Sequence, residues 1–232
     1  QSLKLIEEAG PPPLAVLREW PSMNDAFRAW LHEQGETAEF VKLGTGTAEE
    51  AISNPVLFYR SVEFRGVQFA RLCAAATRLL ERLFAPGSYV NSGSIYPSTG
   101  SHPVLGRTGE DVFRLFRNRG VTGYTSEVSW GVNTPDYIGP QTESYDAALG
   151  RSLTKYYGGP VGNYLIVDAN RGYTPDFVET AAYAMAAQGV TWITLYTLGY
   201  PSECNVFGFP DVLAAIRRAG YALGAVEDVL LD

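Results

Sequence analysis

The sequence predicts an α/β fold of the parallel (β/α)-barrel type, in the form of a partial barrel. Short β-rich runs alternate with longer helical patterns, which is typical of crossover units that feed a parallel sheet. Apolar residues make up 46% of the 232 residues, enough for a sizeable core. A closed barrel takes eight strands and about 250 residues, whereas this sequence offers four clear strands and one doubtful one. We therefore expect a single domain over residues 1–232, either part of a barrel that needs a partner segment or a smaller open sheet.

Predicted strands and helices alternate regularly along the second half of the chain. The strand candidates are rich in β-branched and aromatic residues and lie at 88–96, 121–130, 163–169 and 191–198. The helical patterns that follow them lie at 108–118, 144–156, 175–188 and 210–218. Two earlier helices are expected at 23–34 and 55–84, and Pro55 stands where the second can begin. The opening segment 3–9 fits either a strand or a short piece of helix.

Composition excludes several classes of function. Lys and Arg number 18 against 25 Asp and Glu, and no basic run occurs, which argues against nucleic-acid binding. No stretch approaches the roughly 20 apolar residues of a membrane span, so we expect a soluble protein. A start at Gln1 is expected for a processed protein, which favours a secreted or extracytoplasmic location, or for a fragment of a longer chain.

We also expect neither cofactor nor metal. The Gly-rich dinucleotide fingerprint and the lysine-bearing phosphate loop are both missing from the sequence. Two histidines are too few for a histidine-rich metal site, and two cysteines are too few for a disulfide scaffold.

Polar and aromatic residues gather at the ends of the predicted strands, where ligand sites of parallel sheets lie. Those at or just past a strand end are Asn91, Tyr96, Glu127, Trp130, Asp168, Asn170, Arg171, Tyr173, Tyr196 and Tyr200. Glu127 and Asp168 form the kind of carboxylate pair that glycoside hydrolysis requires. One carboxyl protonates the leaving oxygen, and the other stabilises or attacks the oxocarbenium-like carbon. The aromatic rings would pack against the apolar faces of a sugar.

Each of these residues also has a purely structural interpretation. Glu127 can form a buried salt bridge with Arg171, and Asp168 can cap its own loop as an Asx turn. In the catalytic interpretation, desolvation by Tyr124 and Trp130 raises the pKa of Glu127, which makes Glu127 the proton donor. Arg171 then keeps Asp168 ionised.

Part of the sequence resembles a known family. The segments concerned are DAFRAWLHEQGE at 25–36, Asn54-Pro55, a long helix with Tyr59, Phe64 and Phe69, SYVNSGSIYP at 88–97, and GVTWITLYTLGYP at 189–201. Together they resemble the second half of the beta-galactosidase-like barrels of glycoside hydrolase clan A, such as family 42. The resemblance implies that the four clear strands are the fifth to eighth of a barrel and that 3–10 matches the fourth.

The resemblance also implies roles for three acidic residues. The fourth strand of this clan carries the acid/base glutamate, so the resemblance implies that Glu7 or Glu8 is its counterpart. The alternative is that both residues lie on the solvent-exposed face of a helix and have no catalytic role. The seventh strand of the clan ends in a nucleophilic glutamate, and this sequence offers Asp168 there. Aspartate is one methylene shorter, which widens the gap between the two carboxyls and counts against a retaining mechanism.

The sequence thus predicts a glycosidase that cleaves glycosidic bonds in polysaccharide or other carbohydrate metabolism. Its partners are a carbohydrate substrate and either another chain or a missing segment that completes the barrel. A non-catalytic barrel subunit that binds carbohydrate or a protein is the first alternative. A lyase or isomerase on a small open sheet is the second.

Overall fold

The structure is a computed structural model that describes residues 2–6, 11–36, 40–84, 89–92, 111–126, 141–167, 172–196 and 206–231. The chain divides into two compact units. We call residues 1–8, 81–99 and 121–232 the sheet unit, and residues 9–80 and 100–120 the helical unit. The single domain expected over residues 1–232 stays a prediction.

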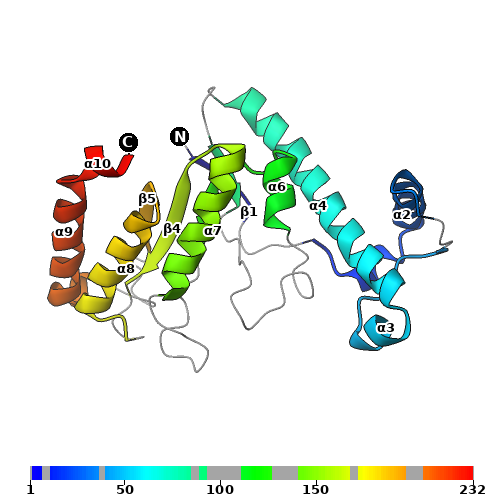
Figure 1. Cartoon of the computed structure of the whole chain (residues 1–232), viewed down its shortest axis with the longest axis horizontal. Coiled ribbons are helices and arrows are strands. Elements are labelled where there is room, and N and C mark those ends of the chain that lie inside the picture. Colours follow the sequence, from blue (N-terminus) through cyan, green and yellow to red (C-terminus); the bar gives the residue numbers. More distant parts are fainter. Residues whose placement is uncertain are drawn as a thin grey trace. The chain divides into compact units, whose positions relative to one another are not determined.

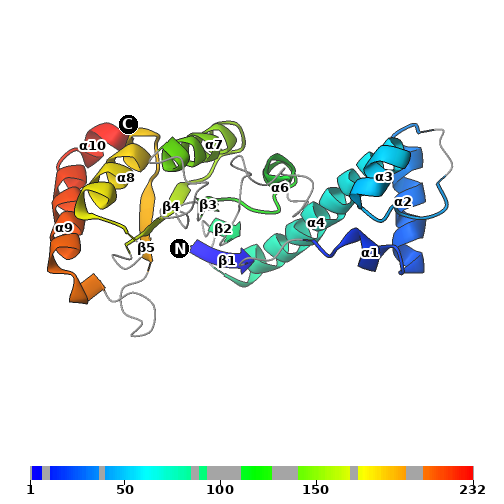
Figure 2. The same cartoon turned by 90° about the horizontal axis from the view of Figure 1, so that it is seen from below.

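All strand pairings in the sheet unit are parallel among the described residues. Strand β1 (Ser2–Ile6) pairs with β2 (Tyr89–Ser92), and β3 (Tyr124–Ser126), β4 (Val161–Ile166) and β5 (Trp192–Tyr196) form a three-stranded sheet in that order. Strand β2 also contacts β3. Neighbouring strands therefore follow one another in chain order, and Figure 2 shows β3, β4 and β5 side by side.

Helices cover one face of the three-stranded sheet. The sheet unit contains α7 (Gln141–Tyr157), α8 (Pro175–Ala187), α9 (Pro210–Gly224) and α10 (Glu227–Leu231), with a 3-10 helix, η3 (Val206–Gly208), before α9. Helix α7 contacts β3 and β4, α8 contacts β4, and α9 packs on α8 (Figure 1). The core between sheet and helices is aliphatic, with Leu165, Val178 and Met185 fully buried. Each such side chain contributes about 1.5–3 kcal/mol when removed from water.

The ends of α8 show how the sequence fixes a helix here. The Thr174 hydroxyl accepts a hydrogen bond from the Phe177 backbone N–H at 3.2 Å, which caps the helix. Pro175 occupies the first helical position, where its missing N–H costs nothing. Gly189 follows the helix with a φ of 88°, a conformation that glycine adopts without strain.

The helical unit is built around one long helix. Its elements are α1 (Leu14–Leu17), α2 (Pro21–Glu33), α3 (Ala48–Ser53), most of α4 (Pro55–Leu83) and α6 (Val112–Arg117). The ring centroids of Phe27 and Trp30 in α2 lie 5.3 and 5.6 Å from that of Phe64 in α4, and 6.2 Å from each other. This aromatic cluster joins α2 to α4 and forms the centre of the unit's core.

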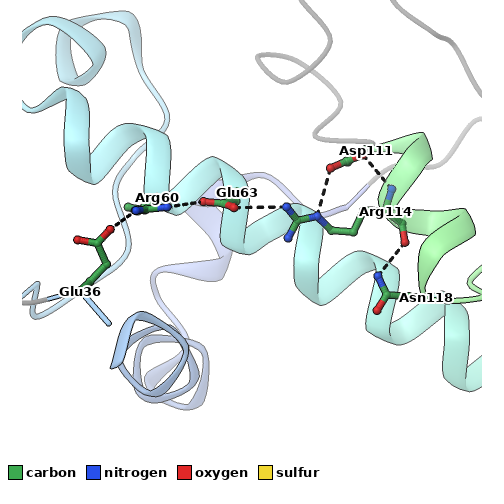
Figure 3. Close-up of polar contacts among 6 residues, drawn as sticks. All are labelled: Glu36, Arg60, Glu63, Asp111, Arg114 and Asn118. Atoms are coloured by element: carbon green, nitrogen blue, oxygen red, sulfur yellow. Dashed lines mark hydrogen bonds and ion pairs between the residues drawn. The ribbon is translucent and has the colours of Figure 1, made fainter. Parts of the chain in front are cut away.

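A chain of ion pairs ties the outer parts of the helical unit together (Figure 3). Arg60 of α4 pairs with Glu36, which follows α2, and with Glu63 at 2.8 Å. Arg114 of α6 bridges Glu63 at 3.3 Å and Asp111 at 3.1 Å. Charges of alternating sign thus link the end of α2 to α4 and α6. Because these side chains are only partly exposed, solvent and salt screen the attraction between them less than at a fully exposed site.

The coarse α/β class is confirmed, because mostly helical described residues surround a small parallel sheet. The helices predicted at 23–34, 55–84 and 175–188 are present within a few residues of the predicted ends. The ambiguous opening segment is a strand, β1. The described residues form no complete barrel, and the finer expectation of a partial barrel stays a prediction. Within the same residues no helix combines the length and the apolar character that a bilayer crossing requires.

Candidate active site

The three-stranded sheet brings its carboxyl ends to one edge. Strands β3, β4 and β5 are parallel, so all three run toward the same side of the unit. Strand β3 ends at Ser126, directly before Glu127, and β4 ends at Ile166, two residues before Asp168. Strand β5 ends at Tyr196. Glu127 and Asp168 lie outside the described residues, so their carboxyl positions stay predictions.

The pairing register sorts the side chains of this sheet onto two faces. Paired residues of a parallel ladder point the same way, and successive residues alternate. The helix-facing side carries Tyr124, Val161, Asn163, Leu165, Ile193 and Leu195. The opposite side, which we call the aromatic face, carries Thr125, Gly162, Tyr164, Ile166, Trp192, Thr194 and Tyr196.

Three half-buried rings make up most of the aromatic face. Tyr164 and Tyr196 meet edge to face, with ring centroids 6.5 Å apart and an angle of 66° between the rings. Trp192 lies over Gly162, and a Cβ at that glycine would overlap the indole. The glycine therefore lets the indole lie against the backbone of β4. Half-buried rings that combine an apolar body with a polar tip are suited to packing against the apolar face of a sugar.

A buried hydrogen bond fixes the helix-facing side. The Tyr124 hydroxyl donates to Oδ1 of Asp146 in α7 at 2.6 Å, and both side chains are fully buried. Gly150, one turn further along α7, faces the Tyr124 ring so closely that a Cβ there would collide with it. Helix α7 is thus held against β3, next to the strand end that leads to Glu127.

The structure describes only some of the predicted site residues. Those outside the described ranges are Glu7, Glu8, Tyr96, Glu127, Trp130, Asp168, Asn170, Arg171 and Tyr200. Asn91 lies in β2, opposite Lys4 of β1. Tyr173 is fully buried, with its ring edge-on to Phe177 at a centroid distance of 5.3 Å. Tyr196 lies on the aromatic face at the carboxyl end of β5, and the roles in substrate binding of all these residues stay predictions.

Sequence reasoning did not single out Trp192 and Tyr164. The signal that could have found them is the period-two pattern of Trp192, Thr194 and Tyr196, which places all three on one face of a strand. Tyr164 joins them only through the pairing of β4 with β5, which no local pattern specifies. The aromatic face is therefore assembled by the register between β4 and β5, which lie far apart in the sequence.

Among the described residues, no group of three His, Cys, Asp or Glu side chains is arranged to hold a metal ion. We compared the chain with known proteins. No protein-family model matches it, and neither a curated protein nor a solved structure is significantly similar to it.

Proposed function

We propose that the chain is a glycoside hydrolase built on the second half of a (β/α) barrel. The order of the strands supports the barrel half, because each described strand neighbours the next one in the chain. Doubly wound sheets instead reverse their strand order near the middle. The aromatic face corresponds to the interior of such a barrel, since α7 and α8 cover the opposite side of the sheet.

One observation carries the proposed active site, namely the alternation of side chains along β3 and β4. Thr125 and Ile166 belong to the aromatic face, and Glu127 and Asp168 follow them by two residues each. Continued alternation turns both carboxylates toward the side that carries Trp192. A proton donor, an ionised carboxylate and aromatic rings that can pack on a sugar then lie together at one end of the sheet, as hydrolysis of a sugar acetal requires.

In this proposal Glu127 donates its proton to the oxygen of the leaving sugar as the glycosidic bond breaks. Asp168 stabilises the oxocarbenium-like carbon, or serves as the base that activates water.

Replacing Glu127 with Gln tests the proposal. We expect kcat on any glycan that the parent chain cleaves to fall by at least about 100-fold, because the amide cannot act as a general acid. Asp168→Asn should cause a loss of similar size. Glu19→Gln is the matched control, since Glu19 is an exposed carboxylate of the helical unit.

Unchanged turnover in Glu127→Gln removes Glu127 from the mechanism. Binding on a glycan array without release of product by the parent chain contradicts hydrolysis. It favours instead a non-catalytic carbohydrate-binding barrel subunit, which the same aromatic face supports.

A further inference from the structure

An apolar pocket opens on the helix-facing side of the three-stranded sheet. It lies between β5 and the helices α8 and α9, and its volume is about 320 Å³. Its floor includes Ile193 and Leu195 of β5, and its walls include Ala182 of α8 and Ile216 of α9. Protein interiors are close-packed and leave few voids larger than a water molecule. Pockets for small molecules begin at about 300 Å³, so this pocket has the size of a ligand site.

Solvent reaches this pocket past two glycines. Gly220 and Gly224 line it on the side of α9, and both are exposed. A Cβ built at either glycine meets no atom within 4 Å. Leu230 also lines the pocket and is partly exposed; it belongs to α10, the short helix that follows α9 in Figure 1. A molecule from solvent can therefore enter the apolar interior.

The charge at the pocket is acidic. Glu227, the first residue of α10, lines the pocket and is exposed. Within the described part of the chain, its carboxylate has no ion pair or hydrogen bond, and no Lys, Arg or His side chain lines the pocket. The remaining lining is almost entirely apolar. Such walls take up an apolar body, and the carboxylate attracts a positive charge.

We propose that this pocket binds a small molecule that has an apolar body and a positively charged amine at one end. The body lies between β5 and α9, and the ammonium group pairs with the Glu227 carboxylate at the opening. The volume is about twice the roughly 150 Å³ of a cavity that holds benzene, so a body of about eight to ten carbon atoms fits. Because the pocket lies on the side opposite the aromatic face, the proposal stands independently of the hydrolase activity.

Isothermal calorimetry of the whole chain with octylammonium chloride, 1-octanol and sodium octanoate tests the site. We expect octylammonium to bind most tightly and octanoate least, because the three share an alkyl chain and differ in the charge of the end group. Gly220→Leu fills the pocket with a side chain and should weaken octylammonium binding at least about tenfold, the effect of keeping two methylene groups out of the pocket. It should not lower Tm, because leucine favours a helix more than glycine does. Ala222→Leu is the matched control, since Ala222 is exposed in the same helix and is not part of the pocket lining.

Two further variants keep the test decisive. Glu227→Gln should weaken octylammonium binding about two- to fivefold, as loss of an exposed ion pair does, and should leave 1-octanol binding unchanged. Gly224→Leu fills the same pocket one turn further along α9 and should repeat the loss of binding if Gly220→Leu does not fold. Equal binding of octylammonium by the parent and by the two leucine variants at the glycines overturns the proposal, as does a parent chain that binds no octylammonium. Equal affinity of the parent for octylammonium and octanoate overturns the assignment to amines.

Discussion

The two faces of the three-stranded sheet differ in composition. The helix-facing side is largely aliphatic, and its central residue Leu165 is fully buried under α8. The aromatic face presents the half-buried rings of Tyr164, Trp192 and Tyr196. Both faces come from the same short strands, since side chains alternate along β4 and β5. One side of the sheet therefore packs against helices, whereas the other carries the ring cluster to which the proposed function assigns sugar binding.

The largest expected effect concerns the helix-facing side. Leu165→Ala should lower the free energy of unfolding by about 2–5 kcal/mol, because it leaves a cavity among α8 and the sheet. Urea unfolding followed by circular dichroism measures this loss. Trp192→Ala on the opposite face is the counterpart, and it should cost less stability while weakening sugar binding about tenfold. Equal losses of stability from both substitutions would remove the distinction between the faces.

A smaller effect is expected where the aromatic face depends on a glycine. Gly162→Ala forces the Trp192 indole away from β4 and should cost about 1–3 kcal/mol of unfolding free energy through overpacking. It should also weaken sugar binding as Trp192→Ala does, which isothermal calorimetry can measure. Gly220→Ala is the control, because a Cβ at Gly220 in α9 meets open space. Intact sugar binding in Gly162→Ala would show that the indole position is irrelevant.

The smallest effect tests the one amide on the aliphatic side. Asn163 is fully buried, and neither its Oδ1 nor its Nδ2 atom has a hydrogen-bond partner in the described residues. Asn163→Leu should therefore raise the free energy of unfolding by about 1 kcal/mol, because an unsatisfied buried amide is replaced by an apolar group of similar shape. Thermal unfolding measures this gain. A clear loss of stability would mean that the amide is satisfied, for example by an internal water.

The sequence was sufficient to predict the elements that local signals specify. Helix α4 was predicted because Pro55 marks its start and apolar residues recur every three or four positions. Strand β5 was predicted because β-branched and aromatic residues fill 191–198. Helix α8 was predicted from Thr174 and Pro175 at its start.

Contacts between distant residues could not be predicted in the same way. The hydrogen bond from Tyr124 to Asp146 joins a strand to the following helix, and no local pattern encodes it. The position of Trp192 over Gly162 depends on the register between β4 and β5. The buried state of Arg65 is equally hidden, since the sequence around it reads as one turn of an ordinary helix. Such features appear only when the chain has folded.

A crystal structure of the chain that resolves Glu127 and Asp168 examines the central claim most directly. We predict that both carboxyl groups project to the side of the sheet occupied by Trp192 and Tyr196, with no more than about 10 Å between them. If instead either carboxyl projects among the helices, or the two project to opposite sides, the chain cannot cleave sugars in the manner described.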